Sequence, residues 1–305
     1  RSRSMLRASF GKWLYELGFA RYIFTHAVLG VQAQCPHLRP FLGEAWKVAW
    51  QWQAAEPSTL RTPMPRSLLK AMVGVALLWH WPVFAGLLLL AFTCFLRPCE
   101  LFNCCRKDLS LPADRLEERG DAFLRVSTPK TWRAFPVQHA RCDDPTVVEL
   151  LHRLFFDWAP NAPLSPFSSA AFRTRWDRIL DSLGVPHAVA QLGVTPGSLR
   201  GSGATDFYMA TEDVTRTFWR GRWRRAATAE RYLQAAAASS VLAGLPPASR
   251  DKIKLLCDSS DGLLAMWLAS PDLFSLRTSS SRRSGARRLK FELGVGHSSR
   301  GRLRR

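Results

Sequence analysis

The sequence Leu96-Arg97-Pro98-Cys99-Glu100-Leu101 stands directly after the most apolar part of the chain. The residues from Ala71 to Leu96 form a run of 26 positions without a formal charge, which is long enough to cross a bilayer as a helix. Against a membrane span, Pro82 lies near the middle of the run, and Trp79-His80-Trp81 is central rather than at an end, where interfacial aromatic residues gather. The pattern therefore predicts two buried helices that meet at Pro82 and deliver Arg97 to the edge of a pocket.

Upstream of this run the chain shows helical periodicity. Three helices are predicted, at residues 8–17, 20–34 and 38–55. The segment 56–66 contains three prolines and breaks the pattern, so we expect a linker there and a first domain at residues 1–62. The chain begins without a signal-peptide pattern, and we expect it to be a fragment of a longer intracellular protein.

Downstream, period-two patterns predict two short strands, at residues 123–127 and 134–137. They flank the polar turn Thr128-Pro129-Lys130-Thr131, so a basic hairpin is expected. Together with the helical segments on both sides, this hairpin predicts a fold that is mainly α with a small β hairpin or sheet.

Further helices are predicted along the rest of the chain, at residues 146–158, 170–183, 198–209, 212–220 and 225–243, with a helical extension at 246–276. The helix at 170–183 has Ser168 or Ser169 as its N-cap and Gly184 as its stop. Its apolar residues fall on one face, which is typical of a helix packed on a core.

The charge distribution points to a polyanionic partner. The chain has a net charge of +19, of which +9 comes from ten basic residues and one acidic residue in the tail at 277–305. Residues 1–276 therefore carry the remaining +10. Counterion release favours binding of such a surface to nucleic acid, although a solvated basic surface is the simpler interpretation. The tail, rich in serine and arginine, is predicted to be disordered.

The seven cysteines form no paired Cys-x-x-Cys motif, and no histidine lies at ligand spacing near the group at residues 99–105. We therefore expect neither a disulfide framework nor a zinc site. Four of the cysteines lie in or beside the most apolar part of the chain, which indicates buried free thiols in a reducing compartment.

Four separated segments carry the candidate chemistry. They are Leu96-Arg97-Pro98-Cys99-Glu100-Leu101, Thr128-Pro129-Lys130-Thr131, Ser198-Leu199-Arg200-Gly201-Ser202-Gly203-Ala204-Thr205, and Gly221-Arg222-Trp223 followed by Glu230-Arg231-Tyr232. In order and spacing they resemble the active-site segments of the tyrosine recombinase, or phage integrase, family. The resemblance spans residues 67–240 and looks closest to the versions carried by eukaryotic mobile elements. Residues 1–62 resemble the end of the family's helical core-binding domain.

The resemblance implies roles for the charged residues of these segments. Arg97 and Arg200 match the two catalytic arginines, whose guanidiniums can clamp the nonbridging oxygens of a doubly negative phosphorane. Glu100 matches the acidic residue one turn after the first arginine. Lys130 matches the hairpin lysine, which can protonate the departing 5′ hydroxyl. Taken singly, each also has an ordinary explanation as an ion-pair partner or a solvated charge.

The resemblance also assigns the nucleophile. Tyr232 matches the attacking tyrosine, 32 residues after the second arginine, and Trp223 matches a position held by His or Trp, nine residues before it. A 3′-phosphotyrosyl link stores the bond energy, so no metal, ATP or other cofactor is expected. One position departs from the family, because Gly197 replaces the histidine three residues before the second arginine. Whether His187 or His139 substitutes for that histidine is open at this point.

These assignments imply a catalytic domain at residues 63–245 that cleaves and rejoins DNA in the integration or excision of a mobile element. The expected partners are double-stranded DNA and further copies of the chain in a synaptic tetramer, with no membrane. The expected location is the nucleus, or the nucleoid of a prokaryote. Two alternatives stay open: a DNA-binding remnant that lost catalysis with the histidine, and a membrane-anchored protein with a basic tail.

Overall fold

The computed structural model describes residues 2–56, 61–127, 137–188, 193–223 and 233–270. The chain divides into two compact units, Arg1–Leu60 and Arg61–Arg305. The boundary lies inside the proline-containing segment 56–66. Each unit has a hydrophobic core of its own.

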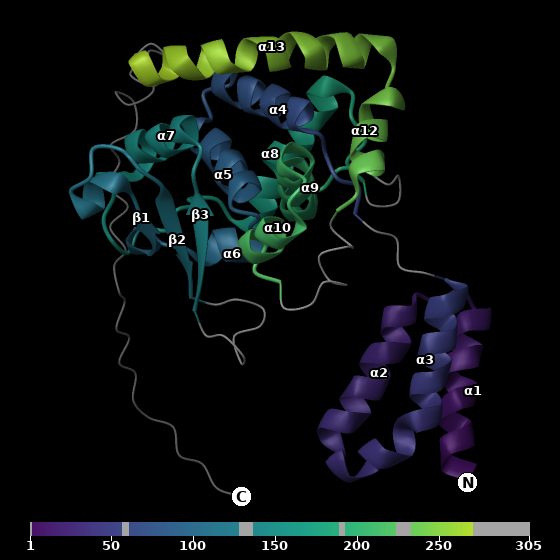
Figure 1. Ribbon diagram of the computed structural model, residues 1–305. Coiled ribbons are helices and arrows are strands. Elements are labelled where there is room, and N and C mark those ends of the chain that lie inside the picture. Colours follow the sequence, from purple (N-terminus) through teal and green to yellow (C-terminus); the bar gives the residue numbers. More distant parts are fainter. Residues whose placement is uncertain (1, 57–60, 128–136, 189–192, 224–232, 271–305) are drawn as a thin grey trace, which may run out of the picture. The chain divides into compact units, whose positions relative to one another are not determined.

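The described residues of the first unit form three α-helices, which Figure 1 shows grouped together. They are α1 (Ser2–Glu16), α2 (Arg21–Gln34) and α3 (Gly43–Ala55), with the 3₁₀ helix η1 (Pro36–Leu42) between the last two. Their apolar faces meet in a small core of Leu14, Phe24, Val28, Leu42, Ala45, Ala49 and Trp52.

One predicted helix of this unit is divided. The prediction of a single helix at residues 38–55 is wrong, because the chain forms η1 up to Leu42 and the α-helix begins at Gly43. Pro40 lies inside η1. Proline has no N–H to donate and its ring crowds the preceding turn, so an α-helix does not run through this position.

The second unit is built around two buried helices, α4 (Arg66–Leu78) and α5 (Pro82–Thr93). The prediction that the long apolar run forms two buried helices is confirmed. They are separated by the turn Trp79-His80-Trp81, and Pro82 takes the first position of α5, where its missing N–H costs nothing. Within the described ranges, no helix combines the length and the apolar character that a membrane span requires.

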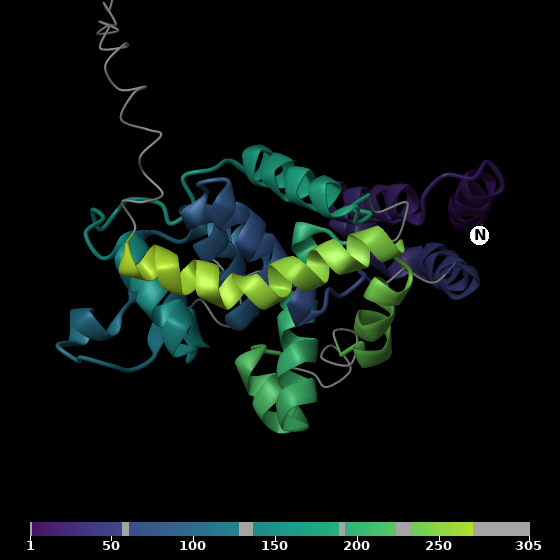
Figure 2. The same ribbon diagram turned by 90° about the horizontal axis from the view of Figure 1, so that it is seen from above.

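Helices cover both of these central elements. Viewed from above, the long helix α13 (Pro247–Ala269) lies along α4 (Figure 2), and Ile253, Leu264 and Trp267 are its buried apolar residues. The other helices among the described residues of this unit are α6 (Pro98–Asn103), η2 (Arg106–Asp108), η3 (Pro112–Arg115), α7 (Pro145–Phe155), α8 (Ser169–Leu183), η5 (Pro196–Ser198), α9 (Leu199–Thr211), α10 (Val214–Arg220) and α12 (Ala235–Ala243).

Helix α8 follows its sequence signals closely. The Ser168 hydroxyl accepts a hydrogen bond from the Ala171 N–H at 3.1 Å, so Ser168 is the N-cap. Gly184 ends the helix with a φ of 68°, a left-handed conformation that glycine adopts at no steric cost. The predicted apolar face is confirmed, because Phe172, Trp176, Ile179, Leu180 and Leu183 are all buried.

A three-stranded antiparallel sheet completes the unit, in the order β1 (Leu109–Ser110), β2 (Ala122–Val126), β3 (Gln138–Cys142). Of the expected second strand at 134–137, residues 134–136 lie outside the described residues and Val137 is not in a strand, while β3 begins at Gln138. This register sets buried Ala140 opposite buried Leu124. Period-two alternation then places the strand's small apolar side chains on the core face.

Helices α5 and α9 approach each other closely at Gly203. A Cβ atom added there would lie 2.0 Å from the carbonyl oxygen of Phe92 at the end of α5. Only glycine fits this contact, since the obstacle is backbone rather than a movable side chain. The contact brings the start of α9 next to the end of α5, where the candidate site lies.

We predict that Gly203→Ala lowers the free energy of unfolding by about 1–3 kcal/mol, because the added methyl group overpacks the contact. Gly262→Ala is the matched control, since an added Cβ in that part of α13 meets no atom within 4 Å. The control should raise stability by about 0.5–1 kcal/mol through its better helix propensity. Urea denaturation measures both, and equal effects of the two substitutions would contradict the close α5–α9 contact.

Candidate functional site

The site is centred on the carboxylate of Glu100, which is fully buried. Three guanidiniums surround it. Arg97 Nη1 lies 2.5 Å from Oε1, Arg222 Nη2 lies 2.9 Å from Oε2, and Arg200 Nη1 lies 3.6 Å from Oε2. A buried carboxylate is tolerated only with such partners, because an unpaired charge in a low-dielectric interior is very costly.

The pairing of Arg97 with Glu100 is set by local structure. Pro98 begins α6, and Arg97 is its N-cap in an extended conformation. Glu100 is three residues later, so its carboxylate reaches back to accept a hydrogen bond from the Arg97 N–H at 3.0 Å. The spacing of arginine and glutamate in this segment therefore places both side chains at one helix end.

Arg200 reaches the same place from the start of α9. Its side chain is 2% exposed, and its Nη1 donates to the Phe95 carbonyl at 2.8 Å while its Nη2 donates to the Gly221 carbonyl. The same Phe95 carbonyl accepts a second bond, from Arg222 Nη2 at 3.1 Å. Phe95 has a φ of 49°, a strained value for a residue with a side chain, and such strain gathers at functional sites.

The Trp223 ring packs against the guanidinium of Arg200. The Arg200 Cζ atom lies 5.3 Å from the centroid of the Trp223 ring, a cation–π contact that fixes the plane of the guanidinium. The ring also stacks on Phe95 at 6.5 Å, and both belong to a small buried cluster with Ala204. The structure thus brings Trp223 to Arg200, as the sequence spacing suggests.

Arg222 is the residue that the sequence analysis missed. Its side chain is 7% exposed, and its backbone is left-handed, with a φ of 56°. Nε and Nη1 are buried and have no hydrogen-bond partner among the residues the structure describes. The sequence does contain an indication of its role, because in the segment Gly221-Arg222-Trp223 a third arginine directly precedes the tryptophan that matches the family.

The electrostatics of the cluster favour an anion. Burial by itself would raise the pKa of Glu100, but the charges of Arg222, Arg200 and Arg97 outweigh it and hold that pKa below its ordinary value. Burial lowers the pKa of Arg222, although a guanidinium stays charged near neutral pH. The three guanidiniums and the one carboxylate of this cluster together have a formal charge of about +2.

A neighbouring arginine is, by contrast, neutralised. Arg220 at the end of α10 makes two bonds to the Asp143 carboxylate, at 2.6 and 2.7 Å, and its hydrogen bond lowers the pKa of Asp143. Arg220 therefore supports the packing of α10 on the end of α5, where it also bonds to the Thr93 carbonyl. It adds little to the local excess of positive charge.

The remaining predicted residues are placed as follows. Lys130 and Tyr232 lie outside the described residues. Gly197 lies in η5, directly before α9. Neither candidate histidine is bonded to the arginine cluster in the described structure: His187 Nε2 lies 2.8 Å from Asp181, and His139 is on β3.

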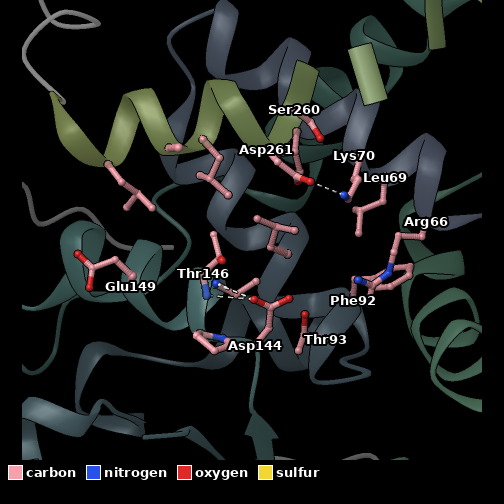
Figure 3. Close-up of a pocket in the computed structure, with 17 residues that line it drawn as sticks. Arg66, Leu69, Lys70, Phe92, Thr93, Asp144, Thr146, Glu149, Ser260 and Asp261 are labelled. Atoms are coloured by element: carbon pink, nitrogen blue, oxygen red, sulfur yellow. Dashed lines mark hydrogen bonds and ion pairs between the residues drawn. The ribbon is translucent and has the colours of Figure 1, made fainter. Parts of the chain in front are cut away.

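Two other features of the described residues are separate from this cluster. A cavity of about 590 Å³ lies between α4, α5, α7 and α13, with the Lys70–Asp261 ion pair at 2.6 Å on its wall (Figure 3). The cavity is not lined by Arg97, Glu100, Arg200 or Trp223.

Among the described residues, no group of three or more His, Cys, Asp and Glu side chains is arranged to hold a metal ion, and all seven cysteines are free.

Comparison with known proteins adds one likeness of fold. No family model matches the chain, and no curated protein sequence matches it. The crystal structure of XerH site-specific recombinase bound to difH substrate, a pre-cleavage complex, is 13% identical with a TM-score of 0.51, over 78% of this chain and 69% of that one. A post-cleavage complex of XerH with palindromic difH is 15% identical with a TM-score of 0.43, over 57% of this chain and half of that one.

The likeness to the pre-cleavage complex shows the fold: the chain folds like the XerH site-specific recombinase. The predicted fold class, mainly helical with a small sheet, is confirmed. The expected closeness to eukaryotic mobile-element versions, the roles of the site residues and the assignments of the domains stay predictions.

We predict that Glu100→Gln lowers the free energy of unfolding at pH 7 by about 3–5 kcal/mol, because three arginines lose their common partner. Glu149→Gln, at an exposed glutamate paired with Arg153, should cost under about 1 kcal/mol. Since the folded pKa of Glu100 is lowered, its contribution is complete above the ordinary value of 4.5 and is lost as pH falls through the lower folded value. Urea titrations from pH 7 to pH 3 check this, and a difference between parent and variant that grows on acidification would contradict it.

Proposed function

We propose that this chain cleaves and rejoins DNA strands through a 3′-phosphotyrosine intermediate. The observation that carries the proposal is the convergence of Arg97, Arg200 and Arg222 on one buried carboxylate, which leaves an excess of positive charge inside the fold. Such preorganised donors stabilise a phosphorane better than they stabilise the ground-state phosphodiester, because the extra negative charge develops in the transition state.

In this proposal the described residues have distinct tasks. Arg97 is 23% exposed, so it is the arginine most open to a phosphate, and Glu100 orients it. Arg200 is held rigidly by two backbone carbonyls and the Trp223 ring, and its guanidinium is therefore in place before the reaction. A fixed donor costs little reorganisation when the transition state forms.

The chemical step uses Tyr232 and Lys130. The Tyr232 oxygen bonds to phosphorus and its proton passes to water, while the bond between phosphorus and the 5′ oxygen breaks. The departing 5′ oxygen takes a proton from Lys130. Religation is the reverse step, in which the 5′ hydroxyl attacks the phosphotyrosine. Neither direction needs ATP, because the covalent link keeps the bond energy.

We further propose that the reaction serves integration or excision of a mobile element in the nucleus, or in the nucleoid of a prokaryote, with copies of the chain assembled as a synaptic tetramer on double-stranded DNA. The net charge of +19 suits a duplex partner. The XerH complex with a similar fold is bound to its difH substrate, which supports DNA as the ligand.

The residue at position 197 favours a second candidate function, DNA binding without strand cleavage. Gly197 stands where the resemblance places a histidine, so a DNA-binding protein that has lost cleavage is the alternative. The two functions differ in whether a covalent protein–DNA product forms, while both require DNA binding.

We predict that a nicked suicide duplex traps a covalent adduct with the parent protein and not with Tyr232→Phe, since the substitution removes only the attacking oxygen. DNA affinity should change by less than about twofold, because the positive surface supplies most of the binding. Denaturing gels measure the adduct and fluorescence anisotropy measures the affinity. Equal adduct from both proteins would move the nucleophile elsewhere, and tight binding without adduct from the parent would support the DNA-binding alternative.

We also predict that removal of residues 277–305, which carry a net charge of +9, weakens nonspecific DNA binding and flattens its dependence on salt. Each lost phosphate contact lowers the slope of log K against log salt by about 0.9. Adduct formation at saturating DNA should persist. Anisotropy titrations at several salt concentrations give the slope, and an unchanged slope would show that the tail does not touch the phosphates.

A further inference from the structure

The space beside Gly197 is occupied by another residue. A Cβ atom built on Gly197 would lie 1.5 Å from Arg61 Nη1 and 2.3 Å from Arg61 Cζ. The guanidinium of Arg61 therefore lies where the side chain of residue 197 would be. Both residues belong to the second unit, at the start of which Arg61 stands.

The position of Arg61 is supported by the backbone that follows it. The Met64 N–H donates to the Ser202 hydroxyl at 2.8 Å in a buried contact, and Arg66 Nε donates to Asp206 at 3.0 Å. These partners lie progressively further along α9, just as Met64 and Arg66 lie further along the chain. The segment 61–66 thus runs beside α9, with Arg61 at the end where that helix begins.

This end of α9 is an unusual place for a cation. The first turn of a helix carries a partial positive charge, so it favours anions and disfavours a guanidinium. Arg61 forms no hydrogen bond or ion pair within the described part of the chain. Residue 197 precedes Arg200 by three positions, and neighbours at this spacing on a helical face are about 5–6 Å apart.

The arginine cluster at Glu100 has more cations than anions. The buried Arg222 side chain shares the Phe95 carbonyl with Arg200, and its Nε and Nη1 have no hydrogen-bond partner in the described ranges. Buried unpaired donors are costly and call for a ligand or another partner. Arg61 is exposed, so its guanidinium is open to a ligand at the position three residues before Arg200. A tetrahedral oxyanion is a ligand whose charge and acceptor oxygens would suit these donors.

We propose that Arg61 binds the phosphate at this site and takes the place of a side chain at position 197. The inference rests on the proposed function, because the phosphate would be that of the DNA strand. Residue 197 must then be glycine for Arg61 to occupy this position, because the side chain of any larger residue would clash with the guanidinium. The arginine comes from the segment that enters the catalytic unit, far from the four segments that resemble the family.

The test compares the parent with Arg61→Ala, with Arg61→Lys, and with the double variant Arg61→Ala/Gly197→His. Arg250→Ala is the matched control, because Arg250 is exposed and its side chain has no partner within the described residues. The probe is inorganic sulfate, a tetrahedral dianion that does not titrate between pH 6 and pH 8. Calorimetry at low ionic strength measures its affinity, and thermal melting shows that each variant is folded.

We expect Arg61→Ala to weaken sulfate binding about tenfold, as the loss of one charge-assisted hydrogen bond predicts. Arg61→Lys should keep part of the affinity and Arg250→Ala should change it less than about twofold, since a distant surface charge is screened. The double variant should regain affinity at pH 6 and lose it at pH 8, because histidine loses its charge near pH 6.5. The parent should be nearly independent of pH over this range.

Several outcomes would overturn the assignment. They are no sulfate binding by the parent, equal affinity of parent and Arg61→Ala, or equal losses in Arg61→Ala and Arg250→Ala. Adduct formation on the nicked duplex is measured in parallel. If the parent forms no adduct while Arg61→Ala still loses sulfate affinity, strand cleavage is refuted and Arg61 remains an anion ligand.

Discussion

The fold of the second unit depends on the neutralisation of one buried charge. Glu100 has no access to solvent, so its carboxylate is stable only with cationic partners close to it. Those partners come from the start of α6, the start of α9 and the turn after α10. One electrostatic requirement therefore joins segments more than a hundred residues apart, and the surplus of guanidinium charge makes the same place an anion site.

This arrangement carries local costs that the rest of the unit offsets. Phe95 and Arg222 both have left-handed backbones without being glycine, and Arg222 keeps two donors unpaired. The close contact at Gly203 and the apolar packing of α4, α5 and α13 supply a rigid frame. Strain in a rigid frame is typical of sites where side chains are held ready for a ligand.

Local sequence signals predicted the elements whose ends they mark. Pro82 separates α4 from α5, and Ser168 and Gly184 bound α8, because caps and prolines act through the nearest few residues. The predictions were less accurate at β3 and at the start of α3. The register of β3 is set by its pairing with β2, which places Ala140 opposite Leu124. Pro40 lies within a 3₁₀ helix where the apolar pattern predicted an α-helix.

The sequence by itself determined the class of fold and the residue types of the site, since the spacing of Arg97, Glu100, Arg200 and Trp223 is readable along the chain. Only the tertiary structure decided that Arg222 joins them and that Arg61 fills the space at Gly197. A motif records neighbours along the chain. The space beside Gly197 and the excess of buried positive charge arise only when distant segments pack together, so they cannot be read from any one segment.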